Sequence, residues 1–179
     1  MVLWWWWIIG GSRESTCCGP QIAKAFGGDV TGVCSTSKVD LVHSLGANHV
    51  IDYLHTNVVD GPRRYDAILD IGGNTRLADL RHILNPRGTL VIVGGETDGR
   101  WLGGTSRQLK AALLSPLSRQ KLCAFIAPEN SHDLTVLGEL IDAGRVHSAI
   151  DRTFLLAEAP KAIQYVREGH ARGKVVITT

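Results

Sequence analysis

The chain has 179 residues, of which 44% are hydrophobic and 20% charged, a composition typical of a folded globular domain with a sizeable core. Its formal net charge at pH 7 is only +2, which argues against nucleic acid and against an anionic membrane surface as partners. We therefore expect an ordinary globular protein of about one domain.

The cysteines predict a reducing, cytoplasmic setting. The four of them contain no C-x-x-C pair, so neither a zinc cage nor a disulfide framework is expected; they are Cys17, Cys18, Cys34 and Cys123. Residues 1–9 are apolar, but this run is too short to span a bilayer. It also lacks the basic start and the small-residue cleavage site of a secretion signal.

The first part of the chain alternates predicted strands and helices. The apolar run over residues 2–9 predicts a strand buried on both faces, although four successive tryptophans are bulky for that place. Gly19 is expected to delay the first helix to residues 21–26, with Pro20 in its first turn. The pattern then predicts a strand over residues 30–34, a polar loop over 35–38, a helix over 39–45 stopped by Gly46, and a strand from Val50.

The alternation continues to the end of the chain. Strands are predicted over residues 65–71, 89–93, 121–127, 150–155 and 174–178, and helices over 74–84, about 109–114, 131–143 and 158–167. Asn74 is expected to cap the first of these helices, and residues 85–88 (Asn-Pro-Arg-Gly) to form a turn. This order predicts an α/β fold, a doubly wound, mostly parallel six-stranded sheet of the Rossmann type.

Residues 35–53 carry the string SxxKxxLxxSLGAxHVIDY, which resembles the medium-chain dehydrogenase/reductase superfamily. The resemblance is to its zinc-independent branch, which is quinone oxidoreductase-like and alcohol dehydrogenase-like, and the segments YDAILDIGG, LNPRGTLVIVGG and EGHARGKVVIT extend it along the chain. It implies an NAD(P)-binding domain over residues 1–145 and a C-terminal extension over 146–179. In the family, the strands of that extension return to a GroES-like catalytic domain.

That catalytic domain has no counterpart in this sequence, so we expect a truncated chain that supplies only the nucleotide-binding half. The strands over residues 150–155 and 174–178 would then expose apolar faces and open edges. Self-association into a homo-oligomer, or a partner chain that covers these strands, is the expected consequence.

The phosphate-binding turn departs from the family pattern. The resemblance places its glycine positions on Gly10, Arg13, Glu14 and Thr16, so that only Gly10, followed by Gly11, keeps the small residue that a close pyrophosphate needs. The negative charge of Glu14 and the Cβ of Thr16 are expected to weaken nucleotide binding. A second interpretation is that the stretch 4–20 is a frameshift, a sequencing error or recent decay.

Ser35, Thr36 and Lys38 follow the second strand, where a ribose contact is made in this fold. No acidic residue stands there to bind the 2′-hydroxyl of NAD(H), and hydroxyls with a lysine suit the 2′-phosphate of NADP(H). The alternative is that Ser35 or Ser37 caps the next helix and Lys38 is solvated. The resemblance places Tyr53 near the adenosine phosphate; the alternative is an aromatic residue at the rim.

Glycine pairs end the fourth and fifth predicted strands, where ligands of open α/β sheets collect. The resemblance implies that these turns pass beside the nicotinamide; ordinary strand-ending turns would use glycine equally well, and the residues are Gly72, Gly73, Gly94 and Gly95. Asp70 before the first pair is expected either to face the ligand or to cap the next helix.

Catalytic residues cannot be assigned from the pattern. The seven histidines show no zinc-ligand spacing with cysteine; His43 and His82 are expected at the surface, and a structural role is favoured for His170. The leading hypothesis is the NADP(H)-binding half of an oxidoreductase that transfers hydride between NADPH and a quinone, enone, carbonyl or alcohol. The alternative is a non-catalytic Rossmann fragment that binds nucleotide weakly or not at all and acts by association. A methyltransferase is disfavoured, because no acidic residue ends the second strand.

Overall fold

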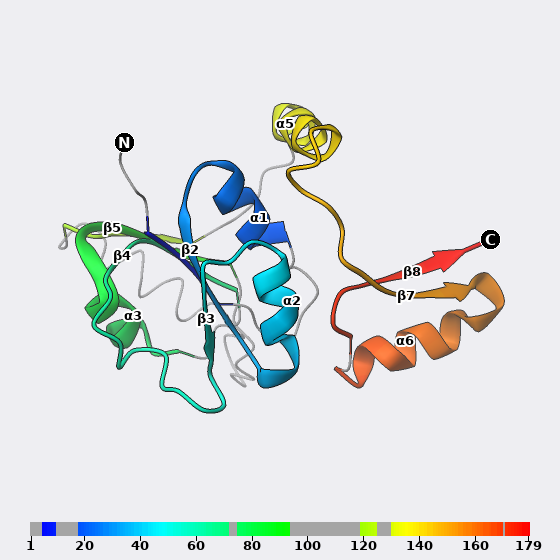
Figure 1. Cartoon of the computed structure of the whole chain (residues 1–179), viewed down its shortest axis with the longest axis horizontal. Helices are drawn as coiled ribbons and strands as arrows, with labels where there is room; N and C mark the ends of the chain where they lie inside the picture. The colour runs from blue at the N-terminus through cyan, green and yellow to red at the C-terminus, as the bar shows by residue number, and fades with distance from the viewer. Residues whose placement is uncertain (1–4, 10–17, 72–74, 94–118, 125–129, 170) are drawn as a thin grey trace.

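The computed structural model describes residues 5–9, 18–71, 75–93, 119–124, 130–169 and 171–179. A parallel sheet with its helices forms the larger part, helix α5 follows, and a strand–helix–strand unit ends the chain (Figure 1).

Six parallel strands form the main sheet, in the order β3-β2-β1-β4-β5-β6. Their bounds are β1 Trp5–Ile9, β2 Asp29–Cys34, β3 His49–Asp52, β4 Tyr65–Asp70, β5 Leu84–Ile92 and β6 Lys121–Ala124. The order runs outward from β1 in both directions, so the chain reverses its winding at β1, as in a doubly wound dinucleotide-binding sheet. The predicted fold class is confirmed.

Helix α1 (Cys18–Ala25) begins before the predicted position. Pro20 lies in the first turn, as predicted, where a proline needs no N–H partner within the helix. Gly19 also lies in that turn and does not delay the helix. The helix ends at Ala25, and Gly27 follows with a φ of 81°, which glycine adopts without strain.

The crossover from β2 to β3 contains a 3₁₀ turn, η2 (Thr36–Lys38), followed by helix α2 (Val39–Ser44). Gly46 follows with a φ of 93°, as predicted for the stop. Gly32 lets α2 approach β2 closely, because a Cβ at this position would overlap Val42 Cγ1. The short helix is therefore held against the sheet at a position where only glycine fits.

The apolar residues of the sheet divide into two buried clusters. The larger one is formed with β4, β5 and α3 around Ile68, Leu80 and Leu90, and the smaller one with β2, α1 and α2 around Val30 and Val42. Burial of such side chains stabilises the fold by about 1.5–3 kcal/mol each. Parallel sheets are usually covered by helices on both faces, and each covered face needs its own apolar cluster. The two clusters agree with that requirement.

The region around α3 (Leu77–Ile83) differs from the prediction. The helix begins at Leu77 with Arg76 at the N-cap position, not at Asn74, which lies outside the described residues. Residues 85–88 belong to β5 rather than to a turn before it. They form an irregularity in the pairing, since Leu84 pairs with Tyr65 and Thr89 pairs with Ala67. A turn composition here produces a bulge, not a chain reversal.

Helix α5 (Ser131–Asp142) agrees with the prediction. The Asn130 side chain caps it by accepting a 2.9 Å hydrogen bond from the backbone N–H of His132. The helix predicted near residues 109–114 lies outside the described residues, as does the predicted end of β6. Among the helices that the structure describes, none is long and apolar enough to cross a bilayer.

The C-terminal unit consists of β7 (Ile150–Leu155), η4 (Leu156–Glu158), α6 (Ala159–Arg167) and β8 (Lys174–Thr178). The two strands are parallel and form a sheet of their own (Figure 1). Large apolar side chains stay exposed on this unit, including Ile150 at 59% and Leu155 at 60%. The expected apolar faces are therefore present, and a two-stranded sheet is marginally stable without further packing.

Candidate functional site

The carboxyl ends of the parallel strands share one edge of the sheet, where ligands of such folds bind. At this edge Cys34 ends β2 and Asp52 ends β3, and the two residues are register partners. The predicted ribose loop, residues 35–38, therefore leaves β2 directly beside the end of β3.

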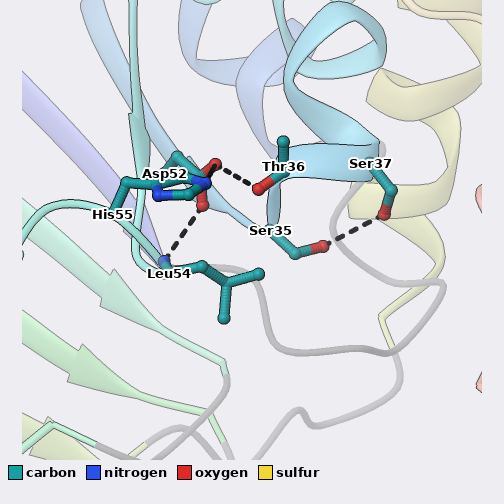
Figure 2. Close-up of polar contacts among 6 residues, drawn as sticks. All are labelled: Ser35, Thr36, Ser37, Asp52, Leu54 and His55. Atoms are coloured by element: carbon teal, nitrogen blue, oxygen red, sulfur yellow. Dashed lines mark hydrogen bonds and ion pairs between the residues drawn. The ribbon is translucent and has the colours of Figure 1, made fainter.

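The hydroxyl side chains of this loop make two separate contacts (Figure 2). Thr36 Oγ1 donates a 2.5 Å hydrogen bond to Asp52 Oδ2, and the hydroxyls of Ser35 and Ser37 lie 3.3 Å apart. Ser35 is the N-cap residue of η2 and Lys38 that of α2, yet neither side chain makes a capping hydrogen bond. Ser35 thus holds an N-cap position, as the alternative supposed, but without a side-chain capping bond, and Lys38 rather than a serine precedes α2.

Asp52 is the residue that sequence reasoning missed. Its second oxygen, Oδ1, accepts a 3.0 Å bond from the backbone N–H of Leu54, and His55 Nε2 lies 3.8 Å from Oδ2 (Figure 2). The hydrogen bond from Thr36 lowers the pKa of Asp52 below its usual value, with the N–H of Leu54 acting in the same sense. The carboxylate is thus ionised at neutral pH and adds a negative charge beside the ribose loop.

Cys34 directly precedes this loop and is 2% exposed. Burial raises the pKa of its thiol to about 11; the charge of Asp52 adds to the rise, while Lys38 opposes it. The thiol is therefore neutral at pH 7, and Cys34 acts as a residue of the smaller buried cluster and not as a nucleophile.

Tyr53 and Asp70 have different surroundings. Tyr53 is 45% exposed, and its backbone N–H donates a 3.1 Å bond to the carbonyl of Cys34, which fixes the chain where β3 ends. Asp70 is fully buried at the end of β4, and its carbonyl accepts a 2.9 Å bond from Val93. Arg76, and not Asp70, holds the N-cap position of α3.

Several predicted positions lie outside the described residues: Gly10, Gly11, Arg13, Glu14, Thr16, Gly72, Gly73, Gly94, Gly95 and His170. Their predicted contacts stay predictions. His43 and His82 are exposed, as expected. Across the part of the chain that the structure describes, no three His, Cys, Asp or Glu side chains gather closely enough to hold a metal ion.

A cavity of about 170 Å³ adjoins the ribose loop on the side of the C-terminal unit. Ser37 and Asp40 line one wall, and Asp151 and Arg172 line the other. Arg172 is a second residue that sequence reasoning missed, because its position far along the chain gives no sign that it lies beside η2. It adds a cationic residue to the lining of a cavity that Ser37 also lines.

Comparison with known proteins agrees with this architecture. The profile of the zinc-binding dehydrogenase family matches residues 45–177, which is most of the chain. The chain belongs to this family, within the medium-chain dehydrogenase/reductase superfamily. The resemblance inferred from residues 35–53 is thereby confirmed.

Individual relatives are oxidoreductases by name. The mitochondrial NAD(P)H oxidoreductase RTN4IP1 of Mus musculus is 33% identical over 172 residues, covering 88% of this chain and 43% of that protein. The trans-enoyl reductase pgmF of Aspergillus terreus is 34% identical over 168 residues, covering 89% and 47%. A quinone oxidoreductase structure from Coxiella burnetii superposes with a TM-score of 0.75 at 24% identity, covering 98% and 53%, and shows the shared fold.

The chain thus spans less than half the length of these curated relatives. The structure holds a doubly wound six-stranded sheet and a C-terminal strand–helix–strand unit. The carboxyl edge of that sheet, with the loop of residues 35–38, is its candidate functional site.

Proposed function

We propose that this chain is the NADP(H)-binding half of an oxidoreductase that transfers hydride between NADPH and a quinone, enone, carbonyl or alcohol. The observation that carries the proposal is the placement of Ser35, Ser37 and Lys38 directly after β2, at the carboxyl edge of a doubly wound sheet. Family membership and the names of the relatives support it.

The residues present suit the 2′-phosphate that distinguishes NADP(H) from NAD(H). Two serine hydroxyls lie 3.3 Å apart and make no capping bond, and Lys38 follows them in the same turn. Arg172 faces the neighbouring cavity from the C-terminal unit. Hydroxyls and cations of this kind bind phosphate oxygens.

Asp52 opposes that preference. Its carboxylate repels a second negative charge and also accepts the hydrogen bond of the Thr36 hydroxyl, which therefore cannot donate to a phosphate at the same time. We propose that Ser35, Ser37 and Lys38 hold the phosphate, while Thr36 ties the loop to β3 and Tyr53 lies at the rim. Asp70 and the glycine positions 10, 11, 72, 73, 94 and 95 complete the proposed cofactor site.

The bound nicotinamide would supply the hydride, and the protein would supply orientation and exclusion of water. The groups that contact the substrate in the family belong to the cleft between two domains, so we assign none of them to this chain. We propose that zinc takes no part, since cysteine and histidine lack zinc-ligand spacing in the sequence. A cytoplasmic location is likewise our proposal, although the relative from Mus musculus is mitochondrial by name.

The test is a titration of the purified chain with NADPH and with NADH, followed through tryptophan fluorescence. We expect saturable binding that favours NADPH, and Lys38→Ala should weaken NADPH binding about tenfold more than NADH binding, since one charge-assisted contact is lost. Lys161→Ala is the matched control, because this exposed lysine pairs with Glu158 on the C-terminal unit. Absence of binding by a demonstrably folded chain would contradict the proposal.

A second candidate is a non-catalytic Rossmann module that acts by association. The exposed apolar residues of β7 and β8 favour it, because Ile150, Leu155 and Ile177 are each exposed on a marginal two-stranded sheet. A second copy, or a partner chain that carries a catalytic domain, would cover these residues. Sedimentation of the chain across a concentration series separates the candidates: association without nucleotide binding supports the second.

A further inference from the structure

A second depression, with a volume of about 640 Å³, opens on the other edge of the sheet from the loop of residues 35–38. Arg64 precedes β4, Leu84 begins β5, and Arg119 precedes β6, so the depression lies at the amino ends of three neighbouring parallel strands. Its size is within the range of small-molecule sites. Nothing in the proposed dinucleotide site uses it.

The lining is strongly cationic. Arg64, Arg81 and Arg119 reach it from three separate segments, and His82 adds an imidazole. Within the described part of the chain, no carboxylate lines this depression. Like charges brought together in this way repel one another, and an anion placed among them removes that repulsion.

Hydrogen bonds to neutral groups hold the cations in place. Arg64 Nη1 donates to the carbonyl of His82, and Arg81 Nε donates a 3.1 Å bond to Gln120 Oε1. Gln120 Nε2 in turn donates to the carbonyls of Arg81 and Leu84 at 2.9 and 3.2 Å. Neutral acceptors orient a guanidinium group without cancelling its charge, so these bonds position Arg64 and Arg81 before any ligand arrives.

Some of these bonds also complete the end of α3, where carbonyls have no partner within the helix. That structural role accounts for Arg64 and Gln120. It does not account for Arg119, which lines the same depression from the segment before β6.

We propose that this depression binds a compact polyanion, a small molecule that carries two or more phosphate or carboxylate groups. Arginine is suited to both groups, because its planar guanidinium binds two oxygens of either one at the same time. Leu84 and Pro86 provide a small apolar contact beside the cations, which favours an organic anion with a short carbon frame.

The experiment is isothermal titration calorimetry of the full chain with two probes, sodium tripolyphosphate and sodium citrate, at low ionic strength. Saturable binding of one equivalent is expected for at least one of them. Tighter binding of tripolyphosphate indicates a phosphate-bearing ligand, and tighter binding of citrate indicates a polycarboxylate. Arg119→Gln should weaken binding about tenfold, since one charged hydrogen-bond donor group is removed.

Three variants distinguish this site from the loop of residues 35–38 and from nonspecific attraction of anions to surface arginines. Arg64→Gln should weaken binding to a similar degree, whereas Arg167→Gln, at the end of α6, should leave it unchanged. Lys38→Ala should also leave it unchanged, because Lys38 belongs to the loop at the opposite edge. Unchanged binding in both Arg64→Gln and Arg119→Gln, or loss of binding in Lys38→Ala, would overturn the proposal. Thermal unfolding of Arg119→Gln verifies that the exposed substitution leaves the fold intact.

Discussion

The hydroxyl of Thr36 donates a 2.5 Å hydrogen bond to Asp52 Oδ2, so the loop after β2 is fastened to the end of β3. The two residues would act on a bound nucleotide in opposite ways. The loop of Thr36 offers hydrogen-bond donors to a phosphate, whereas the carboxylate of Asp52 repels it. The balance between Lys38 and Asp52 therefore decides how strongly the loop would prefer NADP(H).

Replacing Asp52 by asparagine should raise that preference. Asp52→Asn removes the negative charge beside Ser35 and Ser37 and keeps a side chain of the same shape, so the ratio of NADPH to NADH affinity should rise roughly tenfold. Fluorescence titration with both nucleotides measures it. Asp60→Asn is the control, since Asp60 is an exposed carboxylate that bonds only to the local Asn57 among the contacts described. An unchanged ratio would show that Asp52 does not act on the bound nucleotide.

The same carboxylate gives a pH dependence of known sign. The folded-state pKa of Asp52 is lowered by Thr36, so the ionised form stabilises the folded chain above the unfolded pKa of about 4. That contribution is lost as pH falls through the lower folded value. Urea unfolding at neutral and at acidic pH should therefore show a smaller acid loss of stability in Asp52→Asn than in the parent chain, and equal losses would contradict this assignment.

Cysteine labelling should distinguish the thiols. Cys34 is buried and its pKa is raised to about 11, whereas Cys123 is exposed on β6. Iodoacetamide at neutral pH should modify Cys123 first and leave Cys34 intact until the chain is unfolded in urea. Peptide mass spectrometry follows both sites. Labelling of Cys34 at the rate of Cys123 in the folded chain would contradict the position of β2.

Gly32→Ala tests the close packing of α2 on β2. The added Cβ would overlap Val42 Cγ1, so the free energy of unfolding should fall by about 1–3 kcal/mol. Truncation in Gly32→Ala/Val42→Ala should recover part of that loss, because it removes the clashing methyl group. Gly138→Ala is the matched control: beyond its own helix, no atom of the described residues lies within 4 Å of the place that its new methyl group would take in α5, and it should stabilise the helix by about 0.5–1 kcal/mol. Urea denaturation measures all three.

Gln21 connects helix α1 to the segment that follows α5. Its Nε2 donates to the carbonyl of His147 and its Oε1 accepts from the backbone N–H of His147, both at 2.9 Å. Gln21 is buried, so Gln21→Ala should cost about 2 kcal/mol and expose the amide of His147 to hydrogen exchange. Gln164→Ala is the control, since that exposed side chain bonds only to Glu168 among the contacts described. Unchanged exchange at His147 would rule out the connection.

Periodicity was sufficient to predict the main sheet, because strands of a parallel sheet, such as residues 5–9, read as continuous apolar runs. It failed where local composition competes with strand pairing: Asn-Pro-Arg-Gly at 85–88 has the composition of a turn but lies within β5. The same limit affected α1, where Gly19 and Pro20 suggested a later start than the one observed.

The sequence predicted only those residues of the candidate site that belong to one continuous segment. Ser35 and Lys38 follow their strand directly, so their place at the carboxyl edge could be inferred from the chain order. Asp52 and Arg172 come from a neighbouring strand and from the C-terminal unit, and their proximity to the loop depends on strand register and on packing. Neither relationship has a local signal in the sequence.

The strand order also determines when the sheet can fold. The central strand β1 contains tryptophans and precedes both of its neighbours in the chain, yet Trp6 pairs with Val30 on one side and with Ala67 on the other. During translation this apolar segment lacks one of its two neighbouring strands until β4 has been synthesised, and it stays exposed to water or bound to a chaperone. Strand β1 is therefore the part of the sheet most exposed to aggregation during synthesis, even though it ends in the middle of the finished sheet.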